Sequence, residues 1–165
     1  MKIKKLTLIG LLTAAALIIF VVELQIPNPI PIPGIKLGLA NIICVYAMFA
    51  LGSNAAFMIL ICRIILGSIL TGQTAALIYS LSGGILCFFS MLVMRKIVTI
   101  NQLWVCSAVS AVFHNIGQMA AALFITKTPA ILVYFPLLLI SGIIAGLFTG
   151  LCAQFLVKRL PHSPG

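Results

Sequence analysis

The feature that most constrains this chain is a nearly continuous apolar sequence that short polar or proline-rich stretches divide into six segments. Of its 165 residues, 63% are hydrophobic and only 7% are charged. About 20 apolar residues in a helix cross the hydrocarbon core of a bilayer, so six such segments use up almost the whole length. The sequence therefore predicts one all-α integral membrane domain, a bundle of six transmembrane helices.

The breaks between the apolar segments predict where the helices end. The first segment reaches Glu23, the only acidic residue, and is followed by the proline-rich stretch 25–34. That stretch cannot be helical, because its alternate prolines lack an amide hydrogen and disfavour the helical conformation in the residues before them. The predicted helices cover about residues 6–22, 36–51, 55–70, 74–94, 103–125 and 130–157. The sixth is long enough to tilt or to carry a kink.

The basic residues predict the orientation of the bundle in the cell membrane. Cytoplasmic loops retain an excess of Lys and Arg. If the N-terminus is cytoplasmic, the basic residues on the inner side are Lys2, Lys4, Lys5, Arg95, Lys96, Lys158 and Arg159. Only Lys36 and Lys127 then flank helices on the outer side. We therefore expect both termini in the cytoplasm and the proline-rich stretch outside.

The composition excludes several classes of function. With no Asp and one Glu, the chain lacks the paired carboxylates that acid–base catalysis and magnesium sites need, and it has no GxxxxGK[ST] phosphate loop. Its ten Lys and Arg are scattered without interleaved aromatic residues, so nucleic acid is not an expected partner. The five cysteines show no metal-ligand spacing. We therefore expect neither an enzyme nor a bound metal or cofactor.

Polar residues inside the predicted helices mark a candidate binding site, because such groups are costly in a bilayer unless they are paired or hydrated. Arg63 lies near the middle of the third helix, roughly 12 Å from its outer end at 1.5 Å per residue. The predicted pocket opens outward, and we expect the inner half of the bundle to carry few polar groups. Its candidate residues are Glu23, Lys36, Asn41, Arg63, Tyr79, Ser80, His114, Asn115 and Gln118. Their net positive charge suits a small anionic or amphipathic ligand between apolar walls.

Each of these features also has a purely structural interpretation. Arg63 and Glu23 could form an ion pair that holds the first and third helices together. The polar residues of the fifth helix could make interhelical hydrogen bonds. Tyr79 and Ser80 could be ordinary packing residues, and the proline-rich stretch could be a spacer instead of a lid.

Small residues recur on two helices. In the sixth they are spaced four apart at Gly142, Gly146 and Gly150, a pattern that lets a neighbouring backbone approach closely. Packing within the bundle is the favoured interpretation there. Gly10 and Ala14 form a shorter version on the first helix, where docking of a partner protein is the alternative to internal packing.

Several motifs resemble a known family over nearly the whole chain. They begin at residues Gly34, Arg63, Tyr79, His114 and Tyr134, and read GIKLGLANI, RIILG, YSLSGG, HNIGQ and YFPLL. They resemble the family called heptaprenyl diphosphate synthase component I, or Gx transporter. That family is similar to the substrate-binding S components of energy-coupling factor (ECF) transporters, which implies six helices, an outward ligand pocket, and small residues on the first helix facing a coupling subunit driven by two ATPases.

Two functions follow as hypotheses. The first is the substrate-binding membrane subunit of an ECF-type uptake transporter, which captures a vitamin-like or precursor-like molecule from the outer side. The second is a non-catalytic membrane partner in isoprenoid or quinone metabolism that handles a polyprenyl or quinone lipid. The synthase label fits a catalytic role poorly, because prenyl synthases use aspartate-rich magnesium sites and this chain has no Asp.

Overall fold

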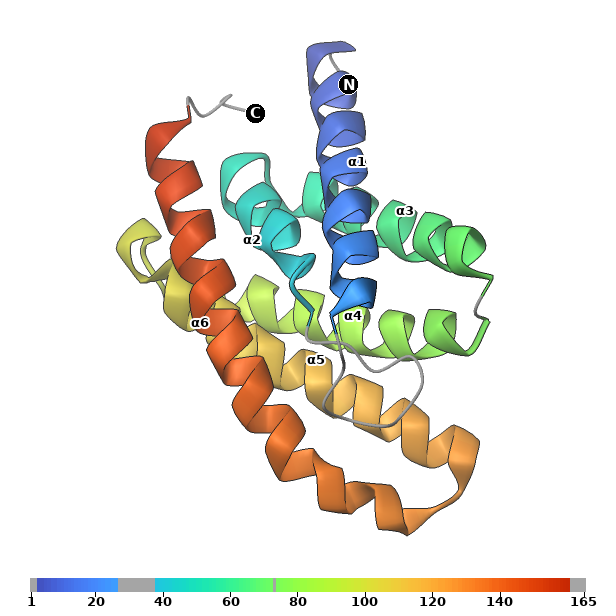
Figure 1. Ribbon diagram of the computed structural model, residues 1–165. Helices are drawn as coiled ribbons and strands as arrows, with labels where there is room; N and C mark the ends of the chain where they lie inside the picture. The colour runs from blue at the N-terminus through green and yellow to red at the C-terminus, as the bar shows by residue number, and fades with distance from the viewer. Residues whose placement is uncertain (1–2, 27–37, 73, 161–165) are drawn as a thin grey trace.

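The computed structural model describes residues 3–26, 38–72 and 74–160, and this part of the chain is helical throughout apart from short turns. The helices of Figure 1 are α1 (Ile3–Gln25), α2 (Asn41–Ala50), α3 (Ser53–Thr71), α4 (Thr74–Met94), α5 (Leu103–Thr126) and α6 (Phe135–Arg159). Two 3-10 helices, η1 (Ile100–Gln102) and η2 (Pro129–Tyr134), precede α5 and α6.

The helix lengths confirm most of the predicted membrane crossings. Five helices are long and apolar enough to span a bilayer, two of them when counted with the 3-10 helix that precedes them: α1, α3, α4, α5 and α6. The 10 residues of α2 reach only about 15 Å, half of the roughly 30 Å hydrocarbon core. The prediction of six membrane-spanning helices therefore holds for five, and the second helix is too short to cross alone.

The predicted start of the second helix at residue 36 is wrong for a local reason. Residues 38–40 form a turn, and Gly38 has a φ of +81°, which interrupts a helix and favours glycine. The helix begins at Asn41, whose N–H donates to the Gly38 carbonyl at 2.9 Å. Non-helical backbone within a membrane bundle is tolerated where protein buries it or where it lines a cavity, so this turn points to a functional region.

The distribution of polar and apolar side chains is the reverse of that in a soluble protein. Large apolar side chains face outward on every long helix, among them Leu11, Ile69 and Phe148, each more than 60% exposed. The polar side chains Arg63 and Gln118 are buried, at 5% and 1% exposure. A surface of this kind is stable in lipid, so the chain is a multi-pass membrane protein.

Glycines allow close helix packing around α5, which lies between α4 and α6. A Cβ on Gly146 of α6 would lie 2.8 Å from Ala108 Cα, and one on Gly150 would lie 2.6 Å from Trp104 Cα. A Cβ on Gly117 of α5 would lie 2.6 Å from a carbonyl oxygen of α4. The glycine stripe of the sixth helix therefore packs within the bundle, as predicted.

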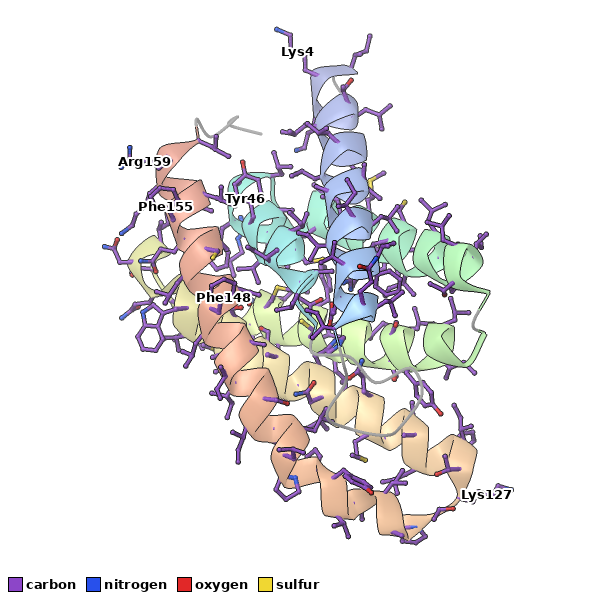
Figure 2. The ribbon with its side chains drawn as sticks, in the orientation of Figure 1. Lys4, Tyr46, Lys127, Phe148, Phe155 and Arg159 are labelled. Atoms are coloured by element: carbon purple, nitrogen blue, oxygen red, sulfur yellow. The ribbon has the colours of Figure 1, made fainter. Side chains whose placement is uncertain are left out.

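The two ends of the described chain lie near each other. The start of α1 and the end of α6 lie toward the same end of the bundle (Figure 1). Lys4 and Arg159 lie there, and Lys127 lies at the opposite end (Figure 2). We call these the terminal end and the opposite end. The sixth predicted segment consists of two helix types, the 3-10 helix η2 followed by α6, which has a proline in its first turn.

Candidate functional site

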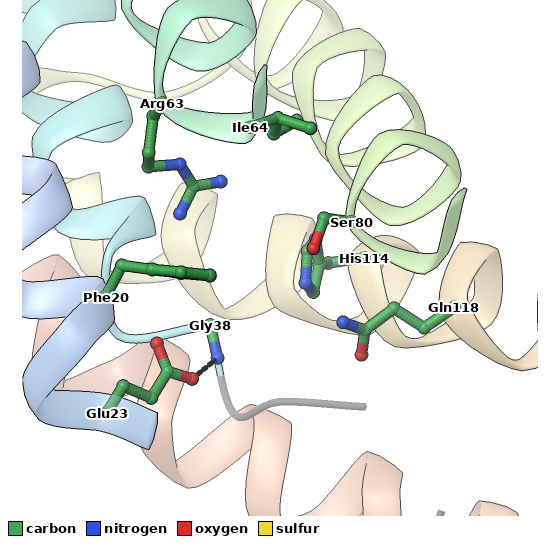
Figure 3. A pocket seen from close by; sticks show the side chains of 8 residues that line it. All are labelled: Phe20, Glu23, Gly38, Arg63, Ile64, Ser80, His114 and Gln118. Atoms are coloured by element: carbon green, nitrogen blue, oxygen red, sulfur yellow. Dashed lines mark hydrogen bonds between the residues drawn. The ribbon is translucent and has the colours of Figure 1, made fainter. Parts of the chain in front are cut away.

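A narrow pocket, the Arg63 pocket, lies where α1, α3, α4 and α5 meet the turn that precedes α2. Figure 3 shows the side chains that line it: Phe20, Glu23, Gly38, Arg63, Ile64, Ser80, His114 and Gln118. Five of them were predicted from the sequence. The unfilled space admits only a few water-sized groups, so it suits a head group better than a whole large ligand.

Arg63 is the central charge of this pocket. Its side chain is 5% exposed, and one terminal nitrogen donates to Asn41 Oδ1 at 3.2 Å. Nε is buried and has no hydrogen-bond partner among the described residues. A guanidinium has five N–H donors, so most of its bonding capacity is free for a ligand.

Glu23 does not neutralise Arg63. Its carboxylate accepts a hydrogen bond from the backbone N–H of Gly38 at 2.5 Å, which joins the end of α1 to the turn before α2. The described residues contain no ion pair between Glu23 and Arg63, and the Phe20 side chain lies between them in Figure 3. The alternative interpretation of Arg63, an ion pair with Glu23, is therefore absent from the described residues, and Glu23 instead stabilises the interrupted second helix.

The opposite wall of the pocket carries polar groups from α4 and α5. His114 and Gln118 lie one turn apart on α5 and are 4% and 1% exposed. His114 Nδ1 and Gln118 Oε1 have no hydrogen-bond partner in the part of the chain that the structure describes. Gly83 of α4 lets the two helices meet here, because a Cβ on it would lie 2.8 Å from the His114 carbonyl oxygen.

The other candidates have different surroundings. Asn41 contacts Arg63 but does not line this pocket. Asn115 donates to the Leu138 carbonyl at 2.7 Å and so joins α5 to α6. Tyr79 is 4% exposed and belongs to a small apolar cluster that includes Leu138. Lys36 lies outside the described residues.

Sequence reasoning missed part of the site. Phe20, Gly38 and Ile64 line the pocket, and only Gly38, a glycine near the predicted start of the second helix, carried a signal in the sequence. The expectation of few polar groups in the half nearer the termini is also wrong. Buried hydroxyl groups pair there between helices: Ser107 with Thr149 at 3.0 Å, and Ser110 with Ser90 at 3.3 Å.

Gly10 and Ala14 are exposed on α1, among the outward apolar side chains Leu11 and Ile18. A Cβ on Gly10 would have nothing within 4 Å. Within the described residues, these two positions therefore do not take part in internal packing.

The lining residues determine what chemistry the pocket can support. Among the described residues no group of three or more His, Cys, Asp or Glu side chains could hold a metal ion. The pocket instead offers a buried cation without a carboxylate partner among the described residues, together with neutral hydrogen-bonding groups and the Glu23 carboxylate, which accepts from Gly38. Such a site favours an anion, because an anion restores the interactions that the guanidinium loses when it leaves water.

Fold and site define a helical, multi-pass membrane protein with an internal polar pocket. The sequence profile of the family described as heptaprenyl diphosphate synthase component I matches residues 12–156, and the chain belongs to that family. The family is a non-catalytic partner component, which agrees with the prediction that the chain is not an enzyme. No curated protein and no solved structure matches the chain.

Proposed function

We propose that this chain is a non-catalytic membrane partner in isoprenoid or quinone metabolism, and that it binds the polar head group of a polyprenyl-type lipid at Arg63. The family name supports a role beside a prenyl diphosphate synthase. The structural support for this proposal is the Arg63 guanidinium, which has no carboxylate partner among the described residues. An anionic head group is the strongest partner for it, and the carbonyl of a quinone would be a weaker acceptor.

The size of the pocket supports a head group as the occupant. A polyprenyl chain is far too large for the few water-sized spaces beside Arg63. The hydrocarbon part would lie against apolar side chains such as Phe20 and Ile64 and continue into the lipid, where its burial costs nothing relative to the bilayer. An amphipathic ligand therefore uses both the pocket and the membrane around it.

Charge supports an orientation with both termini in the cytoplasm of a cell-membrane protein. Lys4, Lys5, Arg95, Lys96, Lys158 and Arg159 would then all lie on the inner side, as the positive-inside rule requires. The Arg63 pocket would then lie close to the midplane of the membrane, on its outer side.

Purification of the tagged chain from native membranes, under mild detergent, tests this function. Co-recovery of a soluble prenyl synthase, and saturable binding of radiolabelled farnesyl diphosphate by the complex, are the expected results. Arg63→Gln should weaken the binding by roughly 100-fold and keep the co-recovery. Recovery of an ATPase pair without a synthase would contradict the proposal.

A second candidate is the substrate-binding subunit of an ECF-type uptake transporter, with a small anionic vitamin-like or precursor-like molecule as ligand. The open surface at Gly10 and Ala14 favours it, because small exposed residues on a membrane helix permit a partner helix to approach closely. The expected partners would be a membrane coupling subunit and its ATPase pair. The same purification separates the two candidates by the identity of the recovered partner.

A further inference from the structure

A second narrow cavity lies between α2, α4, α5 and α6, and Asn41 lines it while Arg63 does not. We call it the hydroxyl cavity, after its polar lining residues Asn41, Ser107, Ser110 and Thr149. Gly38 lines both this cavity and the Arg63 pocket. The space is just large enough for one water molecule, so a bulky ligand is excluded.

The hydrogen bonds on α5 and α6 leave acceptors facing this cavity. Each hydroxyl has one hydrogen to donate and two lone pairs. Either hydroxyl could donate in the 3.0 Å contact between Ser107 and Thr149; because Thr149 also lies 3.2 Å from the Gly146 carbonyl, to which only it can donate, we assign Ser107 as the donor. Ser110 donates to Ser90 at 3.3 Å. The Ser107 and Ser110 hydroxyl groups therefore already donate their hydrogens, and their oxygens keep lone pairs that can accept further hydrogen bonds.

The Asn41 side chain supplies a hydrogen-bond donor to the hydroxyl cavity. Its Oδ1 accepts a hydrogen bond from Arg63 at 3.2 Å, which fixes the amide orientation, because the reversed amide would set an NH₂ group against the guanidinium. Asn41 lines the cavity, its Nδ2 group lies beside Gly38, and no described residue accepts a hydrogen bond from that group. The cavity thus has a donor on one wall and two acceptors on another.

We propose that the hydroxyl cavity binds an ordered water molecule, which accepts from Asn41 Nδ2 and donates to the oxygens of Ser107 and Ser110. Three hydrogen bonds are typical of a water buried in a protein. A cation is disfavoured, because the Arg63 charge lies just beyond Asn41 and no carboxylate lines the cavity. The water holds the Asn41 amide in the orientation that supports Arg63, and so connects the pocket to the packed pair of α5 and α6.

Hydroxyl-radical footprinting by brief X-ray irradiation of the full chain in detergent tests this proposal without any ligand. Irradiation converts a bound water into a radical that oxidises the side chains beside it. Cys87 lines the hydroxyl cavity and is only 1% exposed. Cys44 is a matched control, because it is equally buried at 1% and does not line the cavity. We expect Cys87 to be oxidised several-fold faster than Cys44.

A double variant tests which groups hold the water. Ser107→Ala with Ser110→Ala removes both acceptors, and Cys87 oxidation should fall toward the rate of Cys44. Ser141→Ala is the control, since Ser141 donates only within its own helix, to Leu138, and lines neither cavity. Equal protection of Cys87 and Cys44 in the unaltered protein would overturn the proposal, whether or not the double variant folds. Undiminished oxidation of Cys87 in a folded double variant would overturn the assignment of the acceptors.

Discussion

Replacing Arg63 by Gln removes the one buried cation of the pocket while keeping a hydrogen-bonding side chain of similar reach. In the unaltered protein the guanidinium is 5% exposed and makes one described hydrogen bond, to Asn41. Its remaining N–H groups are free to bind an anion through two parallel hydrogen bonds, as guanidinium groups do with carboxylates and phosphates. The variant leaves only neutral hydrogen bonds to the same ligand.

The expected loss of affinity follows from the strength of those bonds. Hydrogen bonds to charged groups contribute about 1.5–3 kcal/mol each, and neutral ones about 1 kcal/mol. Exchanging two charged bonds for neutral ones therefore weakens binding by about 3 kcal/mol, or roughly 100-fold in Kd. Titration of radiolabelled farnesyl diphosphate against the purified protein measures this change. Arg63→Lys keeps the charge but loses the planar fork, so its affinity should be intermediate.

The same variant separates a ligand role from a structural one. No ion pair joins Arg63 to Glu23, whose carboxylate accepts from Gly38, so Arg63→Gln should not lower the melting temperature in detergent. It could raise it, because a buried cation without a carboxylate partner is unfavourable. A marked fall in melting temperature that Glu23→Gln restores in the double variant, with normal ligand affinity, would refute the reasoning.

Three further changes probe the fold and its surfaces. Gly146→Leu should destabilise the bundle by about 2 kcal/mol or more, seen as a lower melting temperature, because its Cβ would lie 2.8 Å from Ala108 Cα. Gly10→Trp should leave the melting temperature unchanged but weaken recovery of a membrane partner, since nothing lies within 4 Å of a Cβ there; unchanged recovery would place docking elsewhere. In intact cells, an impermeant thiol reagent should modify a Cys at Asn28 and not one at Thr99, and the reverse pattern would overturn the proposed orientation.

Helix positions were largely predictable because a bilayer sets the length of an apolar segment. The α4 boundaries at Thr74 and Met94 are those predicted, since Gly72 and Arg95 bracket an uninterrupted apolar run. The start of α2 was not predictable from hydropathy. Gly38 has a positive φ, and its contacts, to the Glu23 carboxylate and to the N–H of Asn41, are made only in the folded chain.

The site was predictable only in part, for a related reason. Arg63, His114 and Gln118 stand out because strongly polar side chains in apolar segments must face the interior. Which way weaker polar residues face cannot be read from hydropathy, because lipid and protein core are both apolar and the helices have almost no amphipathic asymmetry. Asn115 and Tyr79 therefore looked like pocket residues, although one bonds to Leu138 and the other packs in an apolar cluster.

Native mass spectrometry of the protein released from native membranes tests the central claim most directly, because it needs no prior choice of ligand. The account predicts an additional mass on the unaltered protein that fragmentation identifies as an anionic amphipathic molecule. The same mass should be absent from Arg63→Gln prepared in parallel, and present on the control Ser141→Ala. Equal retention of one ligand by the unaltered protein and by Arg63→Gln would contradict the claim that Arg63 binds it.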